Sequence, residues 1–384
     1  MDYHCSKKFT DLLINVQARQ LQNCCKAWPE RADLDWMEKN PGKIFHTQTM
    51  LEDRGLMLEN KSCHSCHYGC YKYEEQGLTS ARQTQQNSFK KDQPQDPLRS
   101  LQISLSTDCN LTCMYCSSQF STSWHKDIQK NGPYNLQGQT IGNNNWTNLW
   151  AKTKQKQRST ESRFFGLVLK EIKLAKHLEE VYIQGGEPLL NNDLFRLLDA
   201  LANHDVAIRI VTGLGIGSDR LKNFLDKITH MKNVSFDVSA EATGSFFEMI
   251  RYGIRWQDFK ELVNMITDRG FRVQFTSTLS NISIFDFHNF IEFYSNHEID
   301  INPINDRNFL LPHVLDNESK NVFLKNIEKF EPHANIIKKF LEPSPSKHEI
   351  DNLGLFLNEF ARRRSIDLTI LPKNFIEWCA GKVD

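Results

Sequence analysis

Strand-like and helix-like segments alternate along the chain from residue 101 to residue 304. The strand-like segments are short and rich in β-branched or aromatic residues, and they cover residues 101–106, 180–184, 207–212, 234–239, 272–278 and 299–304. Between them, apolar residues recur every three or four positions, as in amphipathic helices, at residues 164–180, 192–204, 219–231, 256–270 and 285–298. Strands that alternate with helices favour a parallel sheet, because each helix returns the chain to the start of the next strand. We therefore predict an α/β fold, with a parallel sheet that is open or curled into part of a barrel.

The regions on either side lack this rhythm. Residues 1–98 show no clear alternation and end in a polar stretch typical of a linker, whereas the residues after 310 look mostly helical. Inside the alternating part, residues 121–160 form a long polar excursion rich in Asn, Gln and Lys, which is typical of a functional lid or a disordered segment. Its Trp124, Trp146 and Trp150 suggest that it packs against the rest of the protein. We predict three regions: a cysteine-rich region at 1–98, the α/β region at 99–310 and a C-terminal helical region at 311–384.

Charge and hydropathy argue against several classes of function. The 47 basic and 47 acidic residues balance, and no basic patch interleaved with aromatic residues is evident, which argues against a nucleic-acid partner. No run of about 18 apolar residues is present, so we expect no membrane span. The N-terminus lacks the apolar stretch of a signal peptide. We expect a cytoplasmic protein.

The ten cysteines are clustered, and only Cys379 lies beyond residue 116. The cytosol keeps thiols reduced, so this clustering favours metal ligation over disulfides. Cys109, Cys113 and Cys116 lie within eight positions and have no fourth cysteine nearby. Such a loop can wrap one side of a cubic iron–sulfur cluster, with three thiolates on three irons and the fourth iron left open. A zinc site completed by a distant fourth ligand is the alternative.

Unusual residues follow four of the predicted strands. The three cysteines follow the first strand, Gly-Gly-Glu-Pro (185–188) the second, Thr-Gly-Leu-Gly (212–215) the third and Ser-Ala-Glu-Ala (239–242) the fourth. In parallel α/β folds the carboxyl ends of the strands share one face, and that face carries the chemistry. The sequence therefore predicts a site at this face.

The stretch CNLTCMYC (109–116) resembles the signature of radical S-adenosylmethionine (SAM) enzymes, in which the open iron of a [4Fe–4S] cluster chelates SAM. The resemblance covers about residues 101–305, and it implies a partial TIM-like barrel of six βα units. It also implies which residues bind SAM: Tyr115 beside the adenine, Gly185, Gly186, Glu187 and Pro188 at the methionine amino group, Thr212 at the third strand end, Ser239 and Glu241 at the ribose and carboxylate, and Arg251 at the carboxylate.

The chemistry of these residue types agrees with the resemblance. A carboxylate such as Glu187 at a strand end can pair with an ammonium group, and Gly185 and Gly186 allow close approach of a ligand to the backbone. The resemblance implies that reduction of the cluster by an external donor, such as flavodoxin or ferredoxin, cleaves SAM to methionine and a 5′-deoxyadenosyl radical. This radical would remove hydrogen from the substrate, so the cofactor carries the hard chemistry and no catalytic side chain is identified.

Plainer interpretations exist for the individual residues. Gly-Gly-Glu-Pro could simply start a helical turn, since Pro is common in the first turn. Arg251 could be a salt-bridged helix residue, and polar residues such as Ser239 and Glu241 are common at strand ends. The combination of motifs, more than any one of them, favours the SAM site.

A second cysteine group lies upstream. Cys63 and Cys66 have metal-ligand spacing, Cys70 lies close by, and Cys24 or Cys25 could complete a site. The stretch from residue 63 to residue 82 resembles the auxiliary-cluster modules called SPASM or twitch, except that those modules more often follow the barrel. The resemblance implies an auxiliary iron–sulfur cluster on these cysteines. Zinc bound with the help of His64 and His67 is the alternative, and we expect Cys379 to be a buried or free thiol.

The leading functional prediction is a radical SAM enzyme that modifies a peptide or protein side chain. Within the same class, a dehydrogenase or rearrangement enzyme acting on a sugar, cyclitol or nucleoside is the alternative. A different class of protein is a non-catalytic zinc-binding scaffold for interactions.

Overall fold

The computed structural model of the chain describes residues 2–75, 77, 79–84, 98–142, 161–304, 307–331 and 333–382. The chain divides into two compact units. The first comprises Met1–Ser106, Thr153–Val211 and Met231–Ser235, and the second comprises Thr107–Lys152, Thr212–His230 and Phe236–Asp384. The boundaries of the three regions expected from the sequence remain a prediction.

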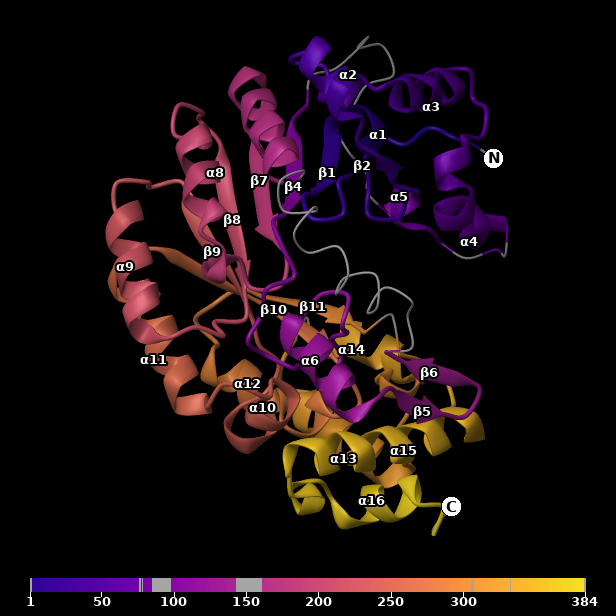
Figure 1. Cartoon of the computed structure of the whole chain (residues 1–384). Coiled ribbons are helices and arrows are strands. Elements are labelled where there is room, and N and C mark those ends of the chain that lie inside the picture. Colours follow the sequence, from indigo (N-terminus) through magenta and orange to yellow (C-terminus); the bar gives the residue numbers. More distant parts are fainter. Residues whose placement is uncertain are drawn as a thin grey trace. The chain divides into compact units, whose positions relative to one another are not determined.

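The first unit is built on a sheet whose central strands run parallel (Figure 1). β4 (Ser100–Ser104) pairs with β1 (Asp11–Asn15) on one side and with β7 (Glu180–Gln184) on the other. β8 (Ala207–Thr212) pairs with β7. The strands after β4 therefore follow one another in sheet order, as expected for strands joined by helices.

The register of these strands aligns their apolar side chains in buried rows. Leu101 lies opposite Leu12 and Val181, and Val181 lies opposite Ile208. All four side chains are buried. Side chains alternate between the two faces of a strand, so a one-residue slip would move each row to the opposite face.

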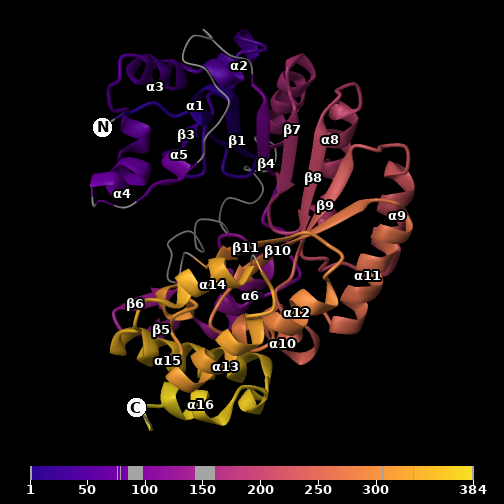
Figure 2. The ribbon, with the colours of Figure 1, turned by 180° about the vertical axis from the view of Figure 1, so that it is seen from behind.

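The N-terminal residues add three strands to this sheet, which the sequence analysis did not anticipate. Beyond β1 lie β2 (Gln20–Gln22) and β3 (Glu30–Arg31), both antiparallel to their neighbours (Figure 2). The helical elements of the first unit are α1 (Lys7–Thr10), α2 (Leu34–Lys39), η1 (Ile44–His46), α3 (Gln48–Leu58), η2 (His64–Cys66), η3 (His67–Tyr71), α4 (Lys72–Glu75), α5 (Ala81–Thr84), a helix over residues 161–174, η4 (Pro188–Leu190) and α8 (Asp193–Leu201).

The second unit contains the later βα elements and the C-terminal helices. β9 (Val234–Ser239) runs from the first unit into the second, and β10 (Arg272–Leu279) pairs in parallel with β11 (Ile299–Pro303). Its other elements are α6 (Thr122–Asn131), β5 (Tyr134–Leu136), β6 (Gln139–Ile141), α9 (Ser218–Ile228), α10 (Gly244–Ile250), α11 (Trp256–Asp268), η5 (Ser283–Phe285), α12 (Phe287–Phe293), η6 (Asn308–Leu310), α13 (Asn317–Ile327), α14 (His333–Leu341), α15 (Lys347–Arg364), η7 (Leu368–Ile370) and α16 (Lys373–Cys379).

The predicted α/β fold with a parallel sheet is confirmed. All six predicted strands are present, five of them within one residue of the predicted bounds at each end, and the chain after residue 310 is mainly helical. The helix predicted at 285–298 is shorter, because α12 ends at Phe293. No helix among the described residues combines the length and the apolar character needed to cross a membrane.

The described part of the polar excursion is folded, as its tryptophans suggest. Residues 121–142 form α6 and the antiparallel β5–β6 hairpin. The reason is local: Ser121 caps α6, and the fully buried Trp124 anchors the helix against Tyr134 and Phe360. Residues 143–160 and the linker residues 85–97 lie outside the described residues.

Candidate functional site

The loop that carries Cys109, Cys113 and Cys116 lies in the second unit, and side chains at the start of α6 hold its first half. Thr122 Oγ1 accepts a hydrogen bond from the Cys109 N–H at 3.0 Å, and Ser123 Oγ donates to the Cys109 carbonyl at 2.8 Å. The hydroxyl of Ser121 donates to the Leu111 carbonyl at 2.7 Å. The polar residues that begin α6 therefore also fix the path of the cysteine loop.

The second half of the loop is held from two sides. The N–H groups of Thr112 and Met114 donate to the carbonyls of Tyr252 and Ile250 at 2.9 and 2.7 Å, so the loop pairs with the C-terminal end of α10 and the residues just after it. On the other side, the indole Nε1 of Trp124 donates to the Cys113 carbonyl at 2.8 Å. The loop is therefore rigidly supported at the central cysteine.

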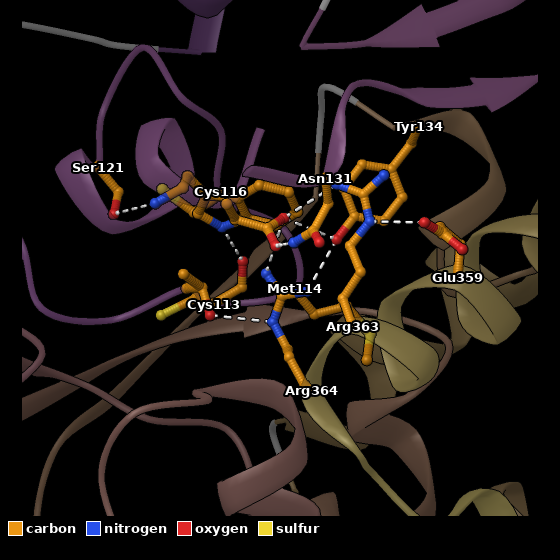
Figure 3. Close-up of polar contacts among 12 residues, drawn as sticks. Cys113, Met114, Cys116, Ser121, Asn131, Tyr134, Glu359, Arg363 and Arg364 are labelled. Carbon is orange, nitrogen blue, oxygen red and sulfur yellow. Dashed lines mark hydrogen bonds and ion pairs between the residues drawn. The ribbon is translucent and has the colours of Figure 1, made fainter. Parts of the chain in front are cut away.

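Two buried arginines complete this support. Arg307 donates to the carbonyls of Met114 and Cys116, and Arg364 donates to Thr112 Oγ1 at 3.0 Å. The two guanidinium carbons each lie 5.0 Å from the ring centroid of Trp124, within the range of a cation–π interaction. Figure 3 shows Arg364 beside the loop segment that carries Cys113 and Cys116.

The predicted SAM-binding residues Tyr115, Glu241 and Arg251 come together beside Cys113. Arg251 forms a buried ion pair with Glu241 at 2.8 Å, and the hydroxyl of Tyr115 donates to the Glu241 carboxylate at 3.2 Å. The Arg251 guanidinium lies 5.5 Å from the ring centroid of Tyr115, and its Nη1 lies 3.9 Å from Cys113 Sγ. Arg251 is thus salt-bridged, as its plainer interpretation expects, and also sits next to the central cysteine.

Burial sets the electrostatics of this group. Glu241 is fully buried, and desolvation raises the pKa of its carboxyl group above the ordinary value, although Arg251 opposes the shift. Burial also raises the pKa of the Cys113 thiol, again against the opposing effect of Arg251. A buried thiol of this kind gives up its proton when a metal takes the proton's place.

The donor set fits a cluster held by three thiolates. Cys113 is 8% exposed, Cys109 and Cys116 are half-buried, and the Leu111 N–H donates to Cys109 Sγ at 3.4 Å. Hydrogen bonds to sulfur and a dry surrounding are features that tune iron–sulfur clusters. Among the described residues, no three His, Cys, Asp or Glu side chains converge as a single ion would need. A cubane cluster does not need such convergence on one point, because each thiolate binds its own iron.

Thr212 and Ser239 are the other two predicted SAM-binding residues of this unit. Thr212 ends β8, is 2% exposed, and its Oγ1 accepts from the Leu214 N–H at 2.9 Å. Ser239 ends β9 and is half-buried. Both lie at carboxyl ends of strands, as predicted, and their roles in SAM binding remain predictions.

The Gly185–Pro188 turn belongs to the first unit and adopts a helix-start geometry. Glu187 is 1% exposed, and its carboxylate accepts from the Leu189 N–H at 3.2 Å, with Pro188 in the first turn. Gly185 has φ +145°, and a Cβ there would lie 2.6 Å from the Ser106 carbonyl oxygen. Gly186 donates to the same carbonyl at 2.8 Å. Close contact between the ends of β7 and β4 therefore already requires glycine at position 185.

The second cysteine group lies in the first unit, where two distant segments pack together. The Trp28 N–H donates to the Ser65 carbonyl at 2.7 Å, and a side chain at Gly69 would collide with the Lys26 carbonyl. The turn with Cys24 and Cys25 is thus held against the segment with Cys63, Cys66 and Cys70. The Lys26 N–H donates to Cys24 Sγ at 3.3 Å.

Cys5 joins this group, although the sequence analysis left it unassigned. It packs against the buried cluster that contains Cys63 and Cys66. Burial, followed by the effects of neighbouring thiols that include Cys24 and Cys70, raises the pKa of Cys5 to about 11. The one signal in the sequence was its membership of the clustered cysteines.

A buried charged network supports the same group. Lys8 Nζ donates to Asp53 Oδ2 at 2.6 Å and to Ser65 Oγ at 2.5 Å, and Ser65 also bonds to Asp53. Ser65 Oγ lies 3.8 Å from Cys63 Sγ, and all these side chains are buried. A hydrogen bond with Cys66 lowers the pKa of Cys63 to about 6, and the Lys8 ammonium acts in the same direction.

The remaining candidates behave differently. His64 and His67 are exposed. Cys379 is half-buried in the second unit at the end of α16, where burial raises its pKa to about 12. The supporting residues Trp124, Arg307 and Arg364 were missed from the sequence, because nothing in their local patterns points to the cysteine loop.

The sequence profile described as "Radical SAM superfamily" matches residues 103–294, which is half of the 384-residue chain. The matched segment begins in β4 and contains the cysteine loop, Gly185–Pro188, Thr212, Ser239, Glu241 and Arg251. No protein of curated function matches the chain in sequence.

Several solved structures resemble the chain in fold. One is anSMEcpe with bound AdoMet, with a TM-score of 0.41 and 13% identity over 65% of this chain and 61% of that chain. Another is Streptococcus suis SuiB bound to S-adenosylmethionine, with a TM-score of 0.33 and 15% identity over 83% of this chain and 69% of that chain. SuiB bound to its precursor peptide SuiA gives 0.34 and 13%, over 84% and 70%. The alignment thus spans about three fifths of the length of anSMEcpe.

Proposed function

The chain belongs to the radical SAM superfamily, and we propose that it modifies a peptide or protein side chain with the help of an auxiliary iron–sulfur cluster in its N-terminal residues. As a member of this superfamily it is an enzyme that uses a [4Fe–4S] cluster and SAM. Membership of this enzyme superfamily argues against the alternative of a non-catalytic zinc-binding scaffold. The substrate class and the auxiliary cluster are the proposed parts.

Cys109, Cys113 and Cys116 would hold the catalytic cluster. When bound, the cluster and SAM together supply a carbon-centred radical that removes hydrogen from an unactivated C–H bond. The protein's own part is to hold these groups and to exclude water. Tyr115 and the buried Glu241–Arg251 pair would orient SAM beside Cys113, as their mutual contacts permit.

The observation that carries the auxiliary cluster is the assembly of cysteines from three distant segments. Cys5 comes from the N-terminal segment, Cys24 from the turn after β2, and Cys63, Cys66 and Cys70 from the segment that contains η2 and η3. The Trp28–Ser65 hydrogen bond supports their convergence, and so does the shared burial of Cys5 with Cys66. We assign Cys24 rather than Cys25 to this group. Cys25 is exposed, whereas Cys24 lies close enough to Cys5 to raise the pKa of the Cys5 thiol electrostatically.

A peptide or protein substrate is proposed because the residues from 63 to 82 resemble SPASM and twitch modules, which occur in peptide-modifying radical SAM enzymes. The auxiliary cluster would accept an electron from a substrate radical or anchor the substrate. A sugar, cyclitol or nucleoside substrate for dehydrogenation or rearrangement is the second candidate. The electron that starts the reaction would come from an external donor such as flavodoxin or ferredoxin.

Anaerobic purification and assay would test this function. We expect brown protein with about eight irons per chain, the content of two cubane clusters. Under reduction it should release 5′-deoxyadenosine from SAM. Short peptides encoded beside the gene are the substrates to assay, with a mass change in the peptide as the measurement.

The controls separate the parts of the proposal. Cys113→Ala should give neither 5′-deoxyadenosine nor modified peptide. A protein with about four irons would contradict the auxiliary cluster but not the superfamily chemistry. Turnover of a sugar or nucleoside, with no change in any neighbouring peptide, would contradict the substrate class.

A further inference from the structure

Side chains from outside the cysteine loop donate to three carbonyl groups in its second half. The Cys113 carbonyl accepts from Trp124 Nε1, and the Met114 and Cys116 carbonyls accept from the two terminal nitrogens of Arg307. Figure 3 labels Cys113, Met114 and Cys116 on the cysteine loop. The planar guanidinium of Arg307 thus binds two carbonyl groups of the cysteine loop at once.

The position of Arg307 sets the direction of two peptide dipoles. In a trans peptide the C=O and N–H groups point in opposite directions. With the carbonyls of Met114 and Cys116 directed to Arg307, the N–H groups of Tyr115 and Ser117 point to the opposite side of the loop. A guanidinium on the oxygen polarises the amide, and polarisation strengthens its N–H as a donor.

Arg307 is shielded from water and lies against aromatic rings. The residue is 5% exposed, and its guanidinium carbon lies 5.0 and 5.2 Å from the ring centroids of Trp124 and Phe356. In such a low-dielectric setting a positive charge acts over several ångströms with little screening. Iron–sulfur reduction potentials respond to nearby charge, to hydrogen bonds at the sulfurs and to solvent exposure.

We propose that Arg307 is a positioning residue of the catalytic cluster, which fixes residues 114–116 and makes the cluster easier to reduce. One electron passes from a low-potential donor to the cluster, so the cluster gains one negative charge. The buried guanidinium and the two polarised peptide groups stabilise that added charge. The proposal rests on membership of the superfamily and not on the substrate or on the auxiliary cluster.

The experiment is an anaerobic redox titration of the full-length protein with dithionite as the reductant, followed by EPR. The signal of the catalytic cluster is identified as the one that changes when SAM is added. Three variants are compared with the wild type. Arg307→Met removes the charge and the planar guanidinium, Arg307→Lys keeps the charge but cannot span both carbonyls, and Arg255→Met removes an exposed guanidinium that pairs with Asp258.

For Arg307→Met we expect about a tenfold lower ratio of reduced to oxidised cluster at a fixed potential, which equals about 59 mV for a one-electron couple. Arg307→Lys should show a smaller shift in the same direction, and Arg255→Met should match the wild type. A purely structural role predicts a different pattern, in which both Arg307 variants lose iron while the remaining clusters keep the wild-type potential.

Two results would overturn the proposal. One is an Arg307→Met protein with full iron content and an unchanged midpoint potential. The other is an Arg307→Lys protein with the wild-type potential, which decides the matter if Arg307→Met does not assemble its cluster. An equal shift in Arg255→Met would also contradict it, because the effect would then come from net charge alone.

Discussion

The two cysteine groups of this protein are built in opposite ways. Cys109, Cys113 and Cys116 lie on one short loop, and the rest of the second unit braces that loop with Trp124 and buried arginines. The N-terminal group draws its cysteines from three segments that meet only in the folded first unit. The three cysteines of the loop are neighbours in the sequence, whereas those of the N-terminal group become neighbours only through tertiary folding.

The two groups show that the spacing of cysteines in the sequence and the contacts that hold those cysteines in place are separate features. In the cysteine loop, the sequence spacing alone suggests the three proposed ligands, and residues from outside the loop hold it. In the N-terminal group, the proposed ligand set depends on contacts between distant segments. A change in packing should therefore alter how firmly the cysteine loop is held. In the N-terminal group, the same kind of change should alter which cysteines come together.

The largest expected effect is on SAM cleavage. Cys113→Ala should reduce 5′-deoxyadenosine formation to background, because Cys113 is the buried central cysteine of the loop that would hold the catalytic cluster. Cys63→Ala should lower the iron content but leave some SAM cleavage that is uncoupled from product. SAM cleavage by both variants is measured by chromatography of the nucleoside products under anaerobic reduction, and the iron content by iron analysis. Normal cleavage by Cys113→Ala would refute the assignment of this loop.

The next effect is on metal content. Cys5→Ala should reduce the iron content from about eight to about four per chain, because the auxiliary cluster loses a ligand. Cys379→Ala is the matched control, since Cys379 lies at the end of α16 in the other unit. Iron analysis of the anaerobic proteins decides the question. Equal iron in both variants would remove Cys5 from the site.

A smaller effect concerns the stability of the N-terminal group. Lys8→Met should destabilise the metal-free protein by about 3–5 kcal/mol, because the buried Asp53 carboxylate would lose its cationic partner. Lys61→Met is the control, since its pair with Glu59 is exposed and worth less than about 1 kcal/mol. Urea denaturation of both variants gives the difference. Similar losses would show that the network around Ser65 is not what holds this region.

The smallest effect is expected behind the cysteine loop, on α15. Arg362 and then Arg363 lower the pKa of Glu359 to about 2. Because the folded pKa lies below the unfolded value, this stabilisation is present at neutral pH and is lost as the pH falls toward 2. Glu359→Gln should therefore cost less than about 1 kcal/mol at pH 7, since the pair is solvent-screened, and the difference should shrink by pH 3. Denaturation at the two pH values measures it, and a difference that grows with acid would contradict this reading.

Much of the fold was predictable from local patterns. The strand ending at Gln184 and the strand from Val234 to Ser239 have the expected bounds, because their β-branched residues are bordered by turn or helix signals. The three-strand addition at the N-terminus was not predictable in this way. Its strands are short, and β1 depends on a partner that lies beyond residue 98. Propensity alone is a weak guide to a strand whose neighbours are distant.

The candidate site divides in the same manner. The cysteine loop, Gly185–Pro188 and the Glu241–Arg251 set could be proposed from motifs. The roles of Trp124 and Arg307 could not, since an arginine or tryptophan carries no sequence signal for the carbonyl it will contact. Gly185 shows a further limit: its glycine is required by contact with Ser106, so the motif alone cannot assign it to ligand binding.

The parallel pairing of β1 with β4 has a consequence for how the protein is made. Residues 11–15 leave the ribosome well before residues 100–104, so the first strand must wait for its partner during synthesis. A truncation after the linker would bare the edge of β4, whose Leu101 and Ile103 are fully buried, and bare strand edges recruit other chains. The N-terminal residues therefore cannot be removed without exposing a strand edge. We expect a chain shortened in this way to aggregate and not to form a smaller active enzyme.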